Sequence, residues 1–170
     1  MEPSPWVKKF ANLIPVGAKV LDLACGKGRH TRYFIERSCF VTSVDINIDN
    51  MQDLSNNPKC QIIAADLENK DDWRLPTDFD AIIVTNYLHR PMLQHLPNAL
   101  SPNGILIYQT FMIGNEAYGK PNNPDYLLAK NELKNTFQNS LNIIEFSEGL
   151  IHETHTAVTQ QICAQLIIKP

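Results

Sequence analysis

Small residues and single carboxylates stand directly after three short apolar segments, in places that suit the binding of a nucleoside. The stretch Asp22–Gly28 (DLACGKG) follows the apolar run at 19–23, and its small side chains let backbone amides approach a ligand closely. Asp45 ends the next run, where a carboxylate accepts hydrogen bonds from both hydroxyls of a ribose. Asp66 follows a third run, and its oxygens suit the exocyclic amine of adenine, which offers two donors. The order of these groups predicts a nucleoside site, although each carboxylate taken alone also fits a helix cap.

The elements that must position these groups alternate in type along the chain. Short apolar and β-branched runs predict strands at 19–23, 40–45, 60–64, 81–84 and 105–109. Helices are expected at 5–12, 31–38, 49–56, 91–100 and 131–139, and a long, lid-like loop at 112–130. This alternation, with nearly continuous apolar strands, indicates a parallel sheet covered on both faces, and such sheets bind ligands beyond the carboxyl ends of their strands.

The last two strands depart from this alternation. They are expected at 141–146 and 158–168, and only the segment 149–157, which has no helical periodicity, joins them. Because parallel strands need a long crossover, this short connection predicts an antiparallel hairpin at one edge of the sheet. At the other end of the chain, Trp6 and Phe10 lie four residues apart on one helix face, and we expect them to pack in the core rather than to cover a site.

Length and composition favour a globular, non-membrane protein. The 170 residues have room for a single domain, 1–170, and no linker or repeat divides them. Fifteen Lys and Arg against eighteen Asp and Glu give a net charge of −3, which disfavours a dedicated nucleic-acid binder. No apolar run approaches the roughly 18 residues of a membrane span, and the first residues lack a signal-peptide pattern, so a cytoplasmic location is expected.

Cysteine and histidine spacing predicts neither disulfides nor a metal site. The four cysteines are scattered, which is typical of buried free thiols in a reducing compartment. The run at 152–155 (HETH) is one residue short of the His-Glu-x-x-His spacing that places both imidazoles on one helix face. No metal is therefore expected.

Five segments together carry a resemblance to a known family. They are Val20–Gly28, Asp45, Ala65–Leu67, Phe79–His89 and Leu100–Leu106. With these motifs in this order, the chain resembles the class I S-adenosylmethionine-dependent methyltransferases over nearly its whole length. The resemblance implies a Rossmann-like, doubly wound, seven-stranded α/β sheet that is mostly parallel with an antiparallel edge hairpin, and S-adenosyl-L-methionine as the cofactor. More narrowly, Gly28-Arg29-His30 and Tyr87–Pro91 look like the small tellurite-resistance-type branch of this family.

The resemblance also implies a set of cofactor-binding residues. The glycine-rich loop would meet the methionine part of the cofactor, Asp45 the ribose, and Thr85 and Asn86 the methionine end. Ile46 would pack on the adenine, which Asp66 and Leu67 would flank. The full set is Asp22, Ala24, Cys25, Gly26, Gly28, Arg29, Asp45, Ile46, Asp66, Leu67, Thr85 and Asn86.

One position departs from the family pattern. Ala24 replaces the first glycine of the usual Asp-x-Gly-x-Gly-x-Gly. A methyl group there is tolerable if φ is negative and costly if φ is positive. We expect cofactor binding to be retained and slightly weakened.

Candidate catalytic residues follow the fourth predicted strand. Tyr87 and His89 lie near the expected methyl position, and an imidazole suits general-base work near neutral pH. The alternatives are that His89 caps or packs at a helix start and that Tyr87 is a wall of the pocket. Arg29 and His30 are candidates for binding the methionine carboxylate, or else form a solvated helix start. The chain has no large insertion to read a macromolecule, so the resemblance favours methyl transfer to a small-molecule acceptor by a monomer or homodimer.

Three other functions are compatible with parts of the sequence. Gly26-x-Gly28-x-x-Thr31 matches two of the three glycines of a dinucleotide fingerprint, but Asp66 and the edge hairpin speak against a nicotinamide-dependent oxidoreductase. A nucleic-acid methyltransferase would need a partner to supply the basic face, and the run 86–89 (NYLH) lacks the Asn/Asp-Pro-Pro-aromatic arrangement. A non-catalytic S-adenosylmethionine-binding protein is the third alternative, because fold does not imply function.

Overall fold

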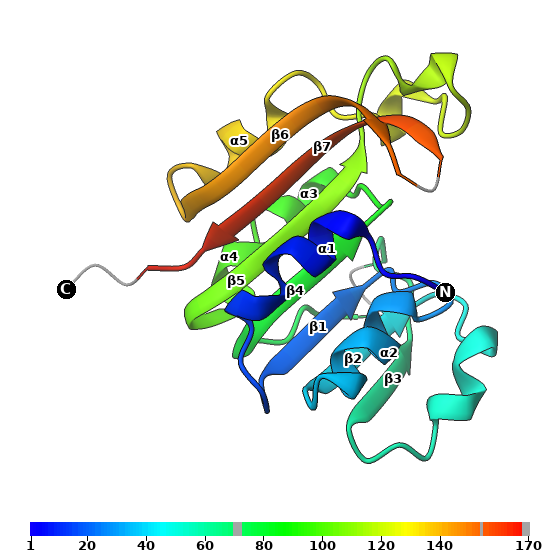
Figure 1. Cartoon of the computed structure of the whole chain (residues 1–170), viewed down its shortest axis with the longest axis vertical. Coiled ribbons are helices and arrows are strands. Elements are labelled where there is room, and N and C mark those ends of the chain that lie inside the picture. Colours follow the sequence, from blue (N-terminus) through cyan, green and yellow to red (C-terminus); the bar gives the residue numbers. More distant parts are fainter. Residues whose placement is uncertain (70–72, 154, 168–170) are drawn as a thin grey trace.

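A seven-stranded mixed sheet organises the chain (Figure 1). The computed structural model describes residues 1–69, 73–153 and 155–167. The strands lie in the order β3-β2-β1-β4-β5-β7-β6. Their bounds are β1 Lys19–Leu23, β2 Phe40–Asp45, β3 Cys60–Ala64, β4 Phe79–Thr85, β5 Leu100–Phe111, β6 Asn142–His152 and β7 Thr156–Gln165.

The pairing confirms the predicted mostly parallel sheet with an antiparallel edge hairpin. β1, β2, β3, β4 and β5 pair in parallel, whereas β7 runs antiparallel between β5 and β6. The hairpin is tighter than the sequence suggested, because most of the predicted connection 149–157 extends the two strands, with Gly149 opposite Thr159 and His152 opposite Thr156. β7 ends at Gln165, short of the predicted end at 168, which lies outside the described residues, as does residue 154 in the hairpin.

The helices are shorter than predicted. They are α1 Pro5–Phe10, α2 Arg29–Glu36, α3 Arg90–Leu93, α4 Leu96–Ala99 and α5 Glu132–Phe137, with 3₁₀ turns η1 Ala11–Leu13, η2 Asp49–Leu54, η3 Asn115–Ala117 and η4 Pro124–Tyr126. The single helix expected at 91–100 is wrong. Pro97 has no amide to donate to the carbonyl of Leu93, so the chain breaks and restarts as α4. The segment 49–56, expected as an α-helix, forms the 3₁₀ turn η2, and the predicted loop 112–130 contains η3 and η4.

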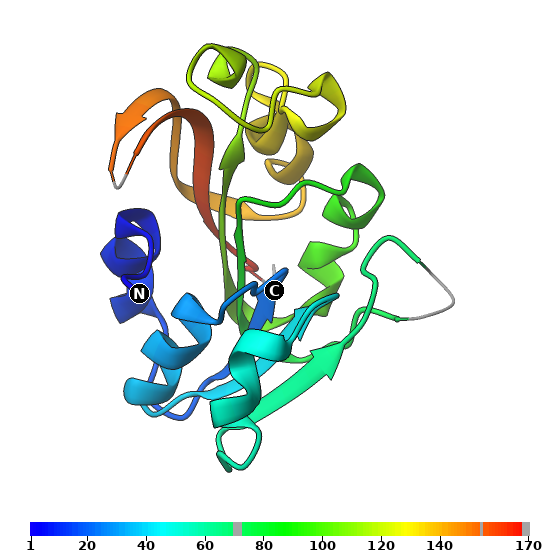
Figure 2. The ribbon, with the colours of Figure 1, turned by 90° about the vertical axis from the view of Figure 1, so that its right-hand side faces the viewer.

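Apolar clusters cover both faces of the sheet. Figure 2 shows α1 and α2 on one side, and α3, α4 and α5 on the other. On the first side, Trp6 and Phe10 pack against Phe34, Ile83 and their neighbours. Their exposures of 6% and 7% confirm that this aromatic pair belongs to the core. None of the described helices is long and apolar enough to cross a membrane.

Truncating Trp6 tests how firmly α1 is docked. Its ring packs edge-on against Phe10 at 4.9 Å, and its Nε1 donates to the carbonyl of Ile162 at 3.2 Å. Trp6→Ala is expected to lower the free energy of unfolding by about 3–5 kcal/mol, because it leaves a cavity and removes a hydrogen bond. Urea denaturation measures the change. The control Leu13→Ala removes an exposed side chain from the adjoining turn, and we expect less than about 0.5 kcal/mol from it. Equal losses in both variants would contradict the docking.

Candidate functional site

The turn after β1 is built from left-handed backbone. Ala24, Gly26 and Gly28 have φ values of +50°, +55° and +72°. Gly28 precedes the first residue of α2, and a Cβ there would lie 2.8 Å from Nη1 of Arg32 and 2.9 Å from Sδ of Met51. The left-handed φ favours glycine at position 28, and a larger residue there would also displace the ends of the Arg32 and Met51 side chains.

Asp45 ties this turn to the end of β2. Its Oδ2 accepts a hydrogen bond from the amide of Gly26 at 2.7 Å, and its Oδ1 accepts from the amide of Asn47 at 3.0 Å. β1 and β2 are adjacent and parallel, so their carboxyl ends meet at the same edge of the sheet. Each carboxylate oxygen has two lone pairs, so Asp45 retains acceptor capacity for a ligand.

A cavity of about 360 Å³ opens beside this carboxylate. Its lining residues are Ala24, Asp45, Ile46, Ala65, Asp66, Leu67, Glu68 and Tyr87. The structure thus brings together six residues that the sequence singled out. Ala65 and Glu68 were not predicted, although Glu68 stands in the same turn as Asp66, whose Oδ1 accepts from the Glu68 amide at 2.9 Å.

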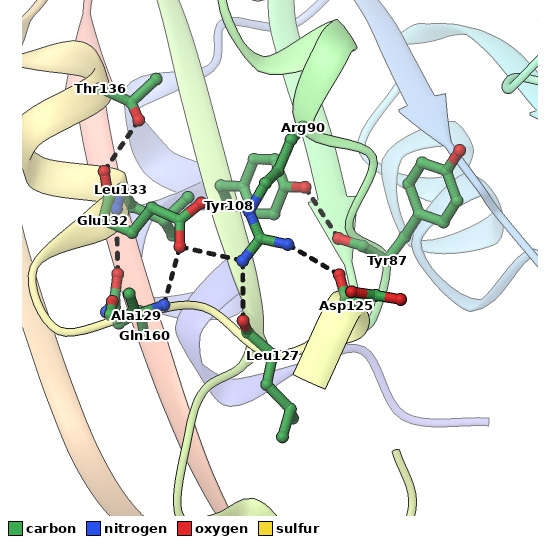
Figure 3. Close-up of polar contacts among 10 residues, drawn as sticks. All are labelled: Tyr87, Arg90, Tyr108, Asp125, Leu127, Ala129, Glu132, Leu133, Thr136 and Gln160. Atoms are coloured by element: carbon green, nitrogen blue, oxygen red, sulfur yellow. Dashed lines mark hydrogen bonds and ion pairs between the residues drawn. The ribbon is translucent and has the colours of Figure 1, made fainter. Parts of the chain in front are cut away.

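The hydroxyl of Tyr87 is buried at this cavity and finds no hydrogen-bond partner among the described residues. Burial, together with the nearby charges of Glu68 and Asp66, raises the pKa of Tyr87 above its usual value, so the group remains a donor. The main chain here is fixed, because the hydroxyl of Tyr108 donates to the carbonyl of Tyr87 at 2.7 Å (Figure 3).

These groups fit the adenosine part of S-adenosylmethionine. The carboxylates of Asp45 and Asp66 could accept hydrogen bonds from ribose hydroxyls and an exocyclic amine. Ile46 is 72% exposed, and it and Leu67 offer apolar surface to a flat ring. Acceptors and apolar surface are therefore both present in one cavity.

Three predicted residues lie beneath the turn, away from the residues that line the cavity. Asp22 is 1% exposed and accepts a hydrogen bond from the Thr31 hydroxyl at 2.6 Å. The Sγ of Cys25 lies 3.5 Å from Sδ of Met51 in a small apolar cluster, and burial raises the pKa of this thiol. Asp22 and Cys25, like Gly28, therefore shape the turn.

The remaining predicted cofactor residues gather on the far side of Ala24. Nη2 of Arg29 lies 3.5 Å from Oγ1 of Thr85, and Asn86 takes a left-handed φ of +57°. Arg29 and Asn86 border a very small cavity of about 20 Å³, which Glu153 and Thr159 also line. Sequence reasoning missed these last two residues, because they come from the distant β6–β7 hairpin.

His30 is not part of a solvated helix start, and it does not supply a positive charge for a carboxylate. It is 1% exposed, and its Nε2 accepts a hydrogen bond from the Ser4 amide at 3.1 Å. Burial lowers the pKa of this imidazole to about 3, so it is neutral at physiological pH. Its role is to hold the N-terminal segment against α2.

The two predicted catalytic residues line different cavities. Tyr87 borders the 360 Å³ cavity and a neighbouring one of about 180 Å³. His89 lines a separate cavity of about 560 Å³, with Trp73 and Met92 among its walls. Leu67 is shared between this larger cavity and the 360 Å³ cavity.

Arg90 anchors the segment that follows β5, an arrangement that sequence reasoning missed (Figure 3). Its Nε donates to Oε1 of Glu132 at 2.7 Å, its Nη1 to the carbonyl of Asp125 at 2.7 Å and its Nη2 to that of Leu127 at 2.8 Å. Burial alone would raise the pKa of Glu132, but its hydrogen bond and ion pair with Arg90 outweigh that effect and lower it. The segment is thus fastened to the helix that follows β4.

Asp22 should make stability depend on pH. Burial raises the pKa of its carboxyl from 3.8 to about 6, so the folded protein binds this proton more tightly than the unfolded chain. The stability that the proton contributes is present below pH 4 and is lost as the pH rises through 6. Relative to the wild type, Asp22→Asn should gain up to about 3 kcal/mol of stability between pH 4 and 7, since each pKa unit is worth about 1.4 kcal/mol. Urea denaturation across this range measures the difference, with the exposed Asp53→Asn as control. A stability difference between Asp22→Asn and the wild type that stays constant with pH would contradict the raised pKa of Asp22.

The positive φ at Ala24 predicts that glycine is better there. A left-handed conformation costs a non-glycine residue about 1–2 kcal/mol, and the extra freedom of glycine in the unfolded chain offsets about 0.4–1 kcal/mol of this. Ala24→Gly is therefore expected to raise the free energy of unfolding by roughly 0.5–1 kcal/mol in thermal or urea unfolding. The control is Ala117→Gly, in the turn η3, which is outside the set of positive-φ residues and should lose stability instead. A loss at both positions would refute strain at Ala24.

Comparisons with known proteins agree with this geometry. The sequence matches the family described as "Methyltransferase domain" over residues 20–104, which is half of the chain. No curated protein matches the sequence.

Three solved structures show the same fold at low sequence identity. TehB from Haemophilus influenzae superposes with a TM-score of 0.74 at 20% identity, covering 95% of this chain and 61% of its own. The 1,6-didemethyltoxoflavin-N1-methyltransferase of Burkholderia thailandensis, solved with 1,6-didemethyltoxoflavin and S-adenosylhomocysteine, gives 0.70 at 18% identity, with coverages of 96% and 76%. An S-adenosylmethionine-dependent methyltransferase from Methanosarcina mazei superposes with a TM-score of 0.73 at 15% identity, covering 99% of this chain and 100% of its own. The chain thus spans less than two thirds of the TehB chain that it matches.

These matches and the carboxylates at the cavity support S-adenosylmethionine as the cofactor. The strand order β3-β2-β1-β4-β5-β7-β6 and the match over 20–104 lead to one conclusion. The chain belongs to the class I S-adenosylmethionine-dependent methyltransferase family.

Proposed function

We propose that this protein transfers the methyl group of S-adenosylmethionine to a small-molecule acceptor. The observation that carries the proposal is the 360 Å³ cavity, which brings the carboxylates of Asp45 and Asp66 together with the apolar side chains of Ile46 and Leu67. The family match supports the reaction type.

When bound, S-adenosylmethionine supplies a methyl group already activated by its sulfonium, so the main task of the protein is alignment. Asp45, Asp66 and Tyr87 would fix the adenosine end at the edge of β1, β2 and β3. Arg29, Thr85 and Asn86 lie next along this edge and would hold the methionine end. Holding two reactants in register contributes on the order of 7–11 kcal/mol to lowering a barrier.

Tyr87 is assigned to binding rather than to proton transfer. The raised pKa of Tyr87 keeps the proton on its hydroxyl at neutral pH. A general base must instead be able to accept and release a proton near that pH. His89 lines the separate 560 Å³ cavity, and we assign it no part in proton transfer.

The size of the second cavity beside Tyr87 favours a small acceptor. It measures about 180 Å³, a volume that suits a small molecule. The Burkholderia neighbour acts on a small heterocycle, and two of the neighbours, from Haemophilus influenzae and Corynebacterium glutamicum, are TehB or TehB-like. We therefore propose the small tellurite-resistance-type branch as the nearest group of this family.

Calorimetric titration with S-adenosylhomocysteine, and in parallel with NADH, tests the assignment. We expect micromolar or tighter binding of S-adenosylhomocysteine and none of NADH. Asp45→Ala should weaken S-adenosylhomocysteine binding about 5- to 150-fold, because ribose hydroxyls lose a charged acceptor worth about 1–3 kcal/mol. The control Asp53→Ala changes an exposed carboxylate paired with Arg32 and should leave the affinity unchanged. Binding of NADH alone, or unaltered affinity in Asp45→Ala, would overturn the proposal.

A further inference from the structure

The cavity of about 180 Å³ lies directly beside the proposed cofactor cavity. Its walls are Asn86, Tyr87, Leu88, Thr110, Phe111, Pro121 and Tyr126. Tyr87 lines both cavities. A molecule in the 180 Å³ cavity would therefore lie next to one in the 360 Å³ cavity, with Tyr87 between them. This places the occupant at the carboxyl ends of β4 and β5, where the methionine end of the cofactor is expected.

The volume of this cavity favours a small occupant. It measures about 180 Å³. Drug-sized ligands occupy cavities of about 300–1,000 Å³. A single six-membered ring with one or two small substituents fits this space.

The walls of the cavity favour an uncharged occupant. The seven described residues that line it are all neutral at physiological pH, and three of them are aromatic. An ionised group placed here would lose hydration without gaining an ion partner. The nearby guanidinium of Arg90 is already committed to Glu132 and to two main-chain carbonyls.

Charged side chains lie in a neighbouring cavity that Asn86 also lines. Arg29 and Glu153 lie there, but the cavity that they share holds only about 20 Å³, the space of about one water. Gln109 and Gln161 already donate to the Glu153 carboxylate at 3.5 and 3.3 Å. Size and existing contacts therefore favour the neutral cavity.

Tyr126 forms the outer wall of this cavity, and its main chain is held on both sides. It closes the turn η4, and Arg90 binds the carbonyls of its two neighbours, Asp125 and Leu127 (Figure 3). Arg90 itself begins α3, three residues after Tyr87, whose carbonyl is bound by Tyr108. The two tyrosine walls are thus fixed relative to each other, which makes the width of the cavity a property of the folded protein.

From these observations we propose that the methyl acceptor is an uncharged molecule of single-ring size, bound between Tyr87 and Tyr126, and that Tyr126 determines its selection. The inference rests on the proposed methyltransferase function and specifies the acceptor of that same site.

Three probes of nearly equal size and shape test the selection: benzamide, which is neutral, benzoate, which is an anion, and benzylamine, which is a cation. Their dissociation constants are measured by ligand-observed NMR on the full chain saturated with S-adenosylhomocysteine. We expect benzamide to bind at least about tenfold more tightly than either charged probe, because only the charged probes lose hydration without an ion partner.

A matched pair of variants tests the role of Tyr126. Tyr126 and Tyr118 belong to the same segment and are 49% and 52% exposed, but only Tyr126 lines the cavity. Tyr126→Ala should weaken benzamide binding about 5- to 10-fold through loss of aromatic contact, and Tyr118→Ala should change it less than about twofold. Thermal unfolding of both variants establishes that they are folded.

The outcomes distinguish a failure of this inference from a failure of the proposed methyltransferase function. No binding of S-adenosylhomocysteine overturns the proposed function and the inference with it. Normal S-adenosylhomocysteine binding with no preference for benzamide, or with equal effects of Tyr126→Ala and Tyr118→Ala, overturns the inference alone.

Discussion

The hydrogen bond between the Asp45 carboxylate and the Gly26 amide, at 2.7 Å, is the contact on which the site depends. It joins the turn after β1 to the end of β2 and so fixes the position of the left-handed backbone at Ala24 and Gly28. The parallel register of the two strands makes this contact possible, because it brings their carboxyl ends to one level. One carboxylate therefore shapes the loop and still presents acceptors to a ligand.

A layer of buried polar groups supports this turn from below. Thr31 contacts both Asp22 and Ser43, which links α2 to β1 and β2 through side chains. The neutral imidazole of His30 accepts the Ser4 amide, so the N-terminal segment is held by the same helix. Buried polar groups of this kind must be paired to be tolerated, and the pairing makes the geometry of the turn unique.

The acceptor side is organised by a different set of contacts. Arg90 gathers the carbonyls of Asp125 and Leu127 and the carboxylate of Glu132, so a segment of low regular structure acquires a fixed path. An arginine suits this task because its planar fork directs several donors at once. The bidentate contact with Glu132 and the hydrogen bond from Tyr108 to Tyr87 place both walls of the proposed acceptor cavity on rigid elements.

The sequence determined the presence of the seven strands, the edge hairpin and six of the eight residues that line the 360 Å³ cavity. Strong apolar runs and a motif in local order carry that information, since each depends on residues close together in the chain. The break at Pro97 is encoded locally, because proline lacks the amide that a continuing helix needs. The tertiary structure alone decided the left-handed φ of Ala24 and the neutral, buried state of His30. It also brought Arg90 to Glu132 and Glu153 to Gln109, pairs that are 42 and 44 residues apart. Such contacts depend on which segments the sheet order makes neighbours, and no local pattern encodes them.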